Sequence, residues 1–379
     1  MKGLTLICLT FILCLSSCIR WDLEKFPLNT FSNHFPVFPA PDALTAQQFV
    51  QLSDGSFRIL GTDTKQQILL LRVSADGKEA TPTPSPGAGK GLDIQNGVGK
   101  NAFGTLVSLR EGLVLLQYAD GVQAKVRTDL SQELAKKFPL IDSLSGANCI
   151  QSPSGNWVVT GLMKQATQPN RLFVGAMRPG GTTEWVHSFD IQLIPVAAFF
   201  SPSGNFFLLA KGINENAVLL RFQPNGVLSL SRPLNQIFIQ QEAGITGDGK
   251  SLVITAAQRS AKGYRTLVTS VSENGDRIWE YNRESTLGVS TGIGIIRDSD
   301  GQIIILAREG TMNSEKYAHK LFKLNQTGEF IWENTFTPGK SGEQLVDLIP
   351  ANDFGYVLLG TDPTGFRVIK TDVLGKFQP

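Results

Sequence analysis

The chain repeats one pattern from about residue 45 onward: an apolar segment, a short turn with glycine, and a second apolar segment. Two copies are nearly identical, SPSGNWVVTG at 152–161 and SPSGNFFLLA at 201–210. The seven turns of this kind carry Gly55, Gly112, Gly155, Gly204, Gly249, Gly301 and Gly355. Tight turns between strands favour glycine because they need a positive φ. The copies therefore predict seven β-hairpins, spaced about 50 residues apart.

Further strand-like segments follow most of these hairpins. The third apolar segments lie at 67–73, 171–177, 217–222, 265–271, 320–324 and 366–370. Most are followed by a second glycine turn and then by a fourth, outer segment. Four-stranded units of this length are typical of propeller blades. The sequence thus predicts an all-β, seven-bladed β-propeller of four-stranded antiparallel blades. An eight-bladed ring, with a degenerate blade within 81–105, is the alternative.

The seventh copy ends where its outer strand should begin, just after Gly375. An incomplete blade would leave an unpaired strand edge, which natural sheets avoid. Counting back from the first inner strand by the usual spacing leads to Asn33–Phe38. We expect this N-terminal segment to close the ring, and Pro36 suits an outer edge strand. The propeller would then span 31–379, with a loop at Thr81–Lys100 and a short helix at Asp129–Lys137.

The N-terminus has the features of a secretion signal. Lys2 is followed by an apolar stretch, Leu4–Leu15, that is too short to span a bilayer. Its end, Leu15-Ser16-Ser17-Cys18, resembles a bacterial lipobox. The resemblance implies cleavage before Cys18 and attachment of diacylglycerol to its thiol. Residues 1–17 would be a lipoprotein signal peptide and 18–30 a tether; an ordinary signal with an incidental Cys18 is the alternative.

Composition excludes several classes of partner and structure. The formal net charge is +2 and only 18% of residues are charged, so no broad basic surface is available for nucleic acid. After cleavage and acylation, Cys149 would be the one free thiol, and no intramolecular disulfide could form. Because Cys149 lies in an apolar strand segment, we interpret it as a small core residue rather than a nucleophile.

Several motifs resemble known propeller families. SPSGN resembles the turn of TolB-type propellers, while SENGDRIW (272–279) and LNQTGEFIW (324–332) resemble the quinoprotein-like pattern. The overall repeat is similar to propeller lipoproteins of Bacteroidota-type bacteria. The quinoprotein-like group includes the propeller lipoprotein of the outer-membrane protein assembly machine. These resemblances imply a fold and a cell-envelope location, and they assign no catalytic residue.

Two short motifs could indicate an enzyme. Gly288-Val-Ser290-Thr-Gly292 matches the nucleophile elbow of hydrolases, but that elbow needs a following helix and this segment precedes a strand. We interpret it as a loop between blades. Gly87–Gly91 lacks the glycine and hydroxyl positions of a phosphate-binding loop. We therefore expect no catalytic residue in either segment.

Metal and cofactor sites have little support in the sequence. The histidines His34, His187 and His319 have no paired spacing. Asp298 and Asp300 belong to a hairpin turn, because glycine follows too early for a calcium loop. We expect no metal and no cofactor.

Two recurring side-chain positions need an explanation. Trp185, Trp279 and Trp332 each lie four residues after a turn glycine. They could stack on a ligand, but packing between blades is the favoured interpretation. Basic residues recur near the end of the third strand, at Arg72, Arg221, Lys323 and Lys370. They could form a ring on one face, and we favour solvated strand ends.

These observations favour a lipid-anchored, non-catalytic propeller that binds a protein or glycan partner in the cell envelope. Ile19 follows Cys18, so the aspartate that retains some lipoproteins in the inner membrane is absent, which favours the outer membrane. One alternative is a periplasmic or extracellular hydrolase or lyase with carboxylates at the central channel. Another is the propeller lipoprotein of outer-membrane protein assembly. An enzyme would bring several carboxylates or a histidine to one pocket with shifted pKa values.

Overall fold

A computed structural model of the chain describes the repeat region with short gaps. The described residues are 30–36, 44–52, 54–63, 68–83, 90–91, 102–109, 112–119, 122–127, 130–137, 141–165, 168–190, 192–212, 214–237, 243–311, 317–337, 342–362 and 364–377. The predicted signal peptide and Cys18 lie outside them. No helix within these ranges is long and apolar enough to cross a bilayer.

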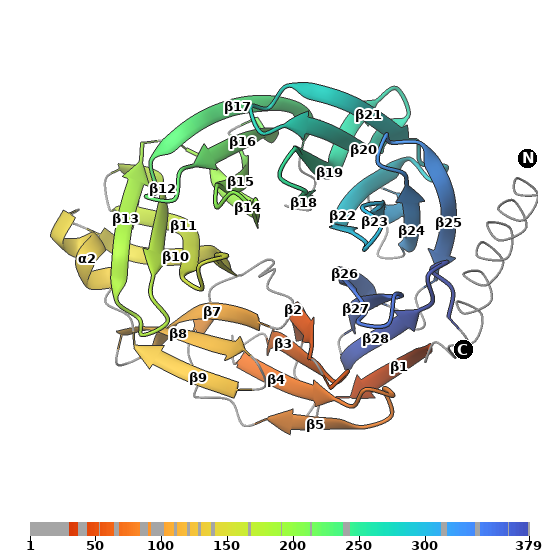
Figure 1. The fold of residues 1–379 in the computed structure, drawn as a ribbon, viewed down its shortest axis with the longest axis horizontal. Coiled ribbons are helices and arrows are strands. Elements are labelled where there is room, and N and C mark those ends of the chain that lie inside the picture. The colour runs from red at the N-terminus through yellow and green to blue at the C-terminus, as the bar shows by residue number, and fades with distance from the viewer. Residues whose placement is uncertain are drawn as a thin grey trace, which may run out of the picture.

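The fold is an all-β propeller, as the sequence predicts. In the described residues the strands form four antiparallel sheets of four strands and one sheet of twelve, arranged around a common axis (Figure 1). The sheet of twelve divides into three antiparallel groups of four that are joined by single residue pairs, so seven groups of four strands can be distinguished. Blade one has β2 (Leu44–Gln51), β3 (Phe57–Asp63), β4 (Ile68–Val73) and β5 (Ala80–Thr83). Blade two has β6 (Lys90–Gly91), β7 (Ala102–Leu109), β8 (Gly112–Ala119) and β9 (Val122–Arg127). Blade three has β10 (Ile141–Gln151), β11 (Trp157–Gln165), β12 (Gln168–Met177) and β13 (Thr183–Phe189).

The remaining blades are more regular. Blade four has β14 (Ile194–Phe200), β15 (Phe206–Lys211), β16 (Asn216–Phe222) and β17 (Leu228–Ile237). Blade five has β18 (Gly244–Gly247), β19 (Ser251–Ser260), β20 (Gly263–Ser272) and β21 (Arg277–Arg283). Blade six has β22 (Val289–Arg297), β23 (Ile303–Gly310), β24 (Ala318–Leu324) and β25 (Phe330–Phe336). Blade seven has β26 (Gln344–Pro350), β27 (Tyr356–Asp362) and β28 (Gly365–Thr371), completed by β1 (Phe31–Pro36).

The N-terminal strand closes the ring, which confirms the prediction. β1 pairs antiparallel with β28, from Phe31 opposite Lys370 to Pro36 opposite Gly365. In Figure 1 this strand lies at the outer edge of blade seven, beside blade one. The short helix is also present, as α2 (Leu130–Lys137) between blades two and three.

One expectation about loops is wrong in part. The segment predicted as a loop, Thr81–Lys100, contributes β5 and β6. These strands complete blades one and two, because β5 pairs with β4 and β6 pairs with β7. The alternation of apolar and polar residues that predicts a strand is weak in such short segments rich in Pro and Gly, so the sequence does not reveal these two strands. The other residues of 84–101 lie outside the described ranges.

The hydrophobic core lies between the blades. Each cluster of buried residues joins two neighbours; Phe57 of blade one, for example, packs with Phe366 of blade seven. Leu208 of blade four packs in the same way with Val174 of blade three. This placement buries both faces of a blade, so an inner strand such as β15, with the sequence FFLLAK, is apolar at every position but its last. The innermost strands are thereby fixed around the axis of the ring.

Candidate functional site

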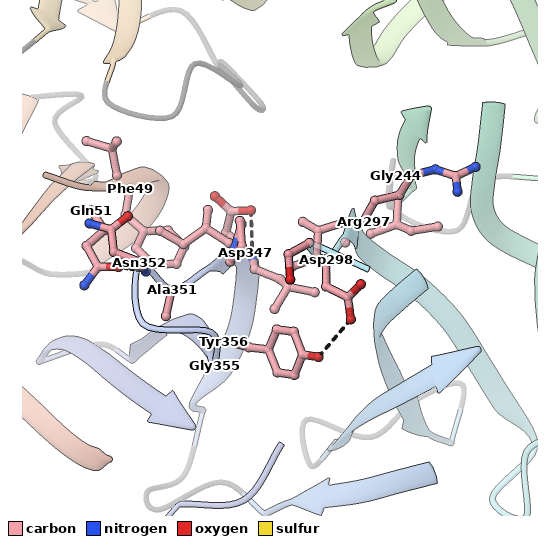
Figure 2. Close-up of a pocket in the computed structure, with 18 of the residues that line it drawn as sticks. Phe49, Gln51, Gly244, Arg297, Asp298, Asp347, Ala351, Asn352, Gly355 and Tyr356 are labelled. Carbon is pink, nitrogen blue, oxygen red and sulfur yellow. Dashed lines mark hydrogen bonds between the residues drawn. The ribbon is translucent and has the colours of Figure 1, made fainter. Parts of the chain in front are cut away.

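A pocket of about 520 Å³ lies in the channel at the centre of the ring. Its apolar wall comes from innermost strands and includes Phe49, Val50, Ile245, Ile295 and Leu348. The first turns of blades six and seven line one part of the pocket, which we call its mouth; Figure 2 labels Asp298, Ala351, Asn352 and Gly355 of these turns. Pockets of this size, apolar with a few polar groups, are typical of ligand sites. The polar lining residues include Gln51, Arg297, Asp298, Asp347, Asn352 and Tyr356.

Arg297 is bound to its own chain. Its guanidinium lies 3.4 Å from an Asp248 carboxylate oxygen. It also donates to the Ser251 hydroxyl at 3.0 Å and to the Gly301 carbonyl at 3.1 Å. Burial lowers the pKa of Arg297, and the charge of Asp248 partly offsets that effect. The arginine therefore links blades five and six rather than facing a ligand.

Asp298 is also fully engaged. Its carboxylate lies 2.8 Å from the Lys323 ammonium and accepts backbone N–H groups of Asp300 and Gln302. The Tyr356 hydroxyl donates to it at 3.5 Å, as Figure 2 shows. Burial first, and then the Asp298 charge, raises the pKa of Tyr356 well above its usual range. This cluster joins blades six and seven, and it confirms the hairpin-turn interpretation of Asp298 and Asp300.

Asp347 differs from both. Its carboxylate accepts the backbone N–H of Leu348 at 2.8 Å, and no ion pair formed within the described residues includes it. Figure 2 shows the carboxylate directed toward the open centre of the channel. Burial raises the pKa of Asp347 to about 7. A carboxyl group shifted by desolvation in a pocket is a candidate functional residue.

The position of Asp347 can be compared between blades. In the described strands the same β-bulge recurs in five inner strands, where the pairing skips one residue. The residue after the skip is Gln48, Asn148, Ala197, Gly294 or Asp347. Bulges re-aim side chains. Since four blades use an uncharged residue here, the bulge itself does not require a carboxylate.

Blade seven differs from the other blades at Asp347 and again seven residues later, in its first turn. In blades one, three, four and six the turn residue with positive φ is a glycine: Gly55, Gly155, Gly204 or Gly301. Each of these donates its N–H to the carbonyl three residues earlier. In blade seven Phe354 makes that bond, with φ 75° and a side chain 65% exposed. An aromatic residue in this conformation is strained, and such strain often lies at functional sites.

The tryptophans pack between blades, which confirms the favoured interpretation. Trp185, Trp279 and Trp332 lie over the second-turn glycines of the next blade: Gly226, Gly328 and Gly375. Trp185 and Trp279 also donate their indole N–H groups to carbonyls of that blade, at 3.0 and 3.1 Å. These side chains are therefore structural.

The basic position is not simply solvated, and that expectation is wrong for two of its members. Lys370 is only 3% exposed and binds Asp353, while Lys323 binds Asp298. Arg72 is exposed and lies 3.5 Å from Asp54. For these three residues the partner lies in the first turn of the same blade. Arg221 differs, because its guanidinium donates to the Glu273 carbonyl at 3.3 Å and to the Asn274 side chain at 3.0 Å, both in the second turn of blade five. The position therefore forms an ion pair with the first turn in three blades and a contact between blades in blade four.

The remaining candidates are separated from the pocket. Ser290 is buried in β22, where its hydroxyl hydrogen-bonds Thr266 at 2.6 Å, so it is part of a strand rather than a loop or an elbow. Cys149 is buried, and burial raises its pKa, as expected of a core thiol. His34 pairs with Asp362 at 2.8 Å, and His319 accepts the Leu345 N–H at 3.0 Å. Among the described residues, no three His, Cys, Asp or Glu side chains form a metal-binding group.

Comparison with known proteins supports the fold alone. No protein-family model matches the chain, and no curated protein matches its sequence. Prolyl oligopeptidase B from Galerina marginata is similar with a TM-score of 0.52 and 10% identity over 88% of this chain. The chain spans about half, 49%, of that enzyme. BBS1N in complex with ARL6DN gives 0.51 and 12% identity, covering 93% and 98% of the two chains. The Dos1 propeller gives 0.50 and 12%, covering 88% and 80%.

Proposed function

We propose that this chain is a lipid-anchored propeller of the bacterial cell envelope that binds a protein partner and catalyses no reaction. The lipobox-like segment ending at Cys18 supports the anchor. Ile19 after it favours the outer membrane. The partner would contact the channel mouth formed by the first turns of blades six and seven.

We infer the binding role from which charged residues of the pocket have an ion-pair partner. Arg297 and Asp298 are held by ion pairs with Asp248 and Lys323, so they position strands. Asp347 alone among the described lining carboxylates has no cation beside it. Most enzymes that hydrolyse glycosides use two carboxyl groups in complementary roles. One such group in an apolar pocket suits recognition better than acid–base catalysis.

The hydrolase or lyase alternative remains a second candidate, because Asp347 has the raised pKa that a general acid needs. It predicts turnover of a peptide or glycan substrate that is lost in the Asp347→Asn variant. Binding without turnover would contradict it. A role in outer-membrane protein assembly would be revealed by the identity of the partner.

Two experiments test the proposal. Cys18→Ala should move the protein from the membrane fraction to the soluble fraction; retention in the membrane would contradict lipid anchoring.

A photo-crosslinking amino acid at Ser299, in the mouth, should capture a partner protein in intact cells. The same probe at Ile278, 57% exposed on the outer strand of blade five, is the matched control. Equal capture at both positions, or none at Ser299, would contradict binding at the mouth.

A further inference from the structure

Blade seven departs from the repeat at two positions, and both departures line the same pocket. Asp347 occupies the position after the inner-strand bulge, and Phe354 occupies the positive-φ position of the first turn. Other blades fill these positions with uncharged residues and with glycine. The blades therefore serve as internal controls: their architecture requires neither a carboxylate nor an aromatic ring there.

The charge of Asp347 is not balanced within the pocket. The other charged lining groups of the described residues, Arg297 and Asp298, form ion pairs with Asp248 and Lys323. An ionised Asp347 in a pocket whose lining includes apolar side chains such as Ile295 and Leu348 is costly unless a cation pairs with it. A bound cation with an apolar body would provide that pairing and would fit the wall. An anionic ligand would be repelled.

Phe354 indicates how far the ligand extends. Its ring is 65% exposed although it lines the mouth, so contact with it continues from the cavity onto the face of the disc. A small amine enclosed beside Asp347 would leave this ring in water. A chain segment that enters the pocket with one side chain would cover it with a neighbouring one. Aromatic rings also attract cations over their faces.

We infer that the channel pocket binds a segment of a partner protein that presents a lysine or arginine among apolar residues. The cation pairs with the Asp347 carboxylate, and the apolar neighbours pack on the channel wall and on Phe354. The inference rests on the proposed binding function and specifies the chemistry of its partner.

A displayed library of random seven-residue peptides, selected on the full-length protein in detergent, tests this assignment. Wild-type protein should enrich peptides with Lys or Arg beside apolar residues. Asp347→Asn should weaken the binding of those peptides by about tenfold or more, as expected when a desolvated charge pair is broken. Phe354→Gly should weaken it by about two- to fivefold. Asp276→Asn, which removes an exposed carboxylate on the outer rim, should leave it unchanged.

Each other outcome overturns the inference. Enrichment that survives Asp347→Asn, enrichment of acidic peptides, or no enrichment would each contradict it. A parallel titration with n-hexylammonium distinguishes a small amine from a peptide side chain as the source of the cation. Binding of this amine without peptide enrichment would assign the pocket to small amines. Thermal melting of each variant verifies that it is folded. If the probe at Ser299 still captures a protein while the library fails, the binding function stands and only the cation assignment falls.

Discussion

The ring of Phe31 lies over Gly77 so closely that a Cβ at position 77 would overlap it. Phe31 belongs to the strand that completes blade seven, and Gly77 lies in the second turn of blade one. Trp185 lies over Gly226 and Trp279 over Gly328 in the same way. The N-terminal strand therefore closes the ring with the contact that the other blades use between neighbours.

Phe31→Ala should destabilise the whole ring. Phe31 is buried, and its ring meets Phe57 of blade one edge-on at 6.2 Å between centroids. Removing a buried aromatic side chain costs about 3–5 kcal/mol. Chemical denaturation should show that loss in the free energy of unfolding. Phe330→Ala is the matched control, because Phe330 is 51% exposed on the outer strand β25, and equal losses would contradict a closing role for Phe31.

His319 should make the protein less stable in mild acid. It is buried and accepts the Leu345 N–H, which joins blades six and seven. Burial, with smaller effects of Arg308 and Arg367, lowers its pKa to about 3. An unfolded histidine titrates near 6.5. Between these values only the unfolded chain binds the proton, so the free energy of unfolding falls as the pH is lowered, by about 2 kcal/mol at pH 5.

His319→Gln isolates this effect. The glutamine oxygen can accept the same N–H but does not titrate. Denaturation curves of the two proteins should therefore differ by a constant amount at pH 7 and 8, with the variant gaining about 2 kcal/mol relative to wild type by pH 5. A difference that stays the same across the whole range would show that His319 is protonated equally in both states.

The sequence predicts the elements that repeat and misses those that depart from the repeat. The turn glycines, the tryptophans and the closing strand follow from spacing, because every blade has the same packing to satisfy. The closing strand is nevertheless displaced: Asn33–Phe38 was expected and Phe31–Pro36 is observed. Counting residues does not give the register of this strand, because loop lengths vary between blades. The burial of Phe31 and Phe35 fixes the register.

The pocket could not be derived from the sequence in the same way. Asp347 becomes conspicuous only when the inner strands are aligned on a bulge, and the bulge appears only in the strand pairing. Phe354 gives a weaker signal in the sequence, because it stands immediately before Gly355, the glycine expected in the seventh hairpin turn. The positive φ lies at Phe354, and glycine is needed at 355 for a different reason, because a Cβ there would overlap the Thr371 carbonyl.

Asp347→Asn should stabilise the protein at alkaline pH. Its folded pKa of about 7 lies above the unfolded value near 4. Between these values the folded chain retains a proton that the unfolded chain has released, so the stability of wild type falls as pH rises. The variant, which carries the residue of Asn148 in blade three, should gain on the order of 4 kcal/mol at pH 8 and less than about 1 kcal/mol at pH 4.

Asp298→Asn is the opposing control for that measurement. It removes a carboxylate from the same pocket but leaves the Lys323 ammonium, now 2.8 Å from a neutral group, without its partner. This variant should lose stability at pH 8, because the buried charge of Lys323 then has no carboxylate to balance it. If both variants change in the same direction, the burial of Asp347 is not the cause of its effect.

Phe354→Gly should cost no stability and should gain up to about 1 kcal/mol. The substitution removes a side chain that is 65% exposed and relieves a φ of 75° that glycine adopts freely. The reverse change is available in blade three, where a Cβ at Gly155 would meet nothing within 4 Å. Gly155→Ala should therefore lose about 1 kcal/mol through backbone conformation alone. Thermal or chemical denaturation measures both. A large loss from Phe354→Gly would mean that the ring stabilises the fold, and its strain would then need no ligand to explain it.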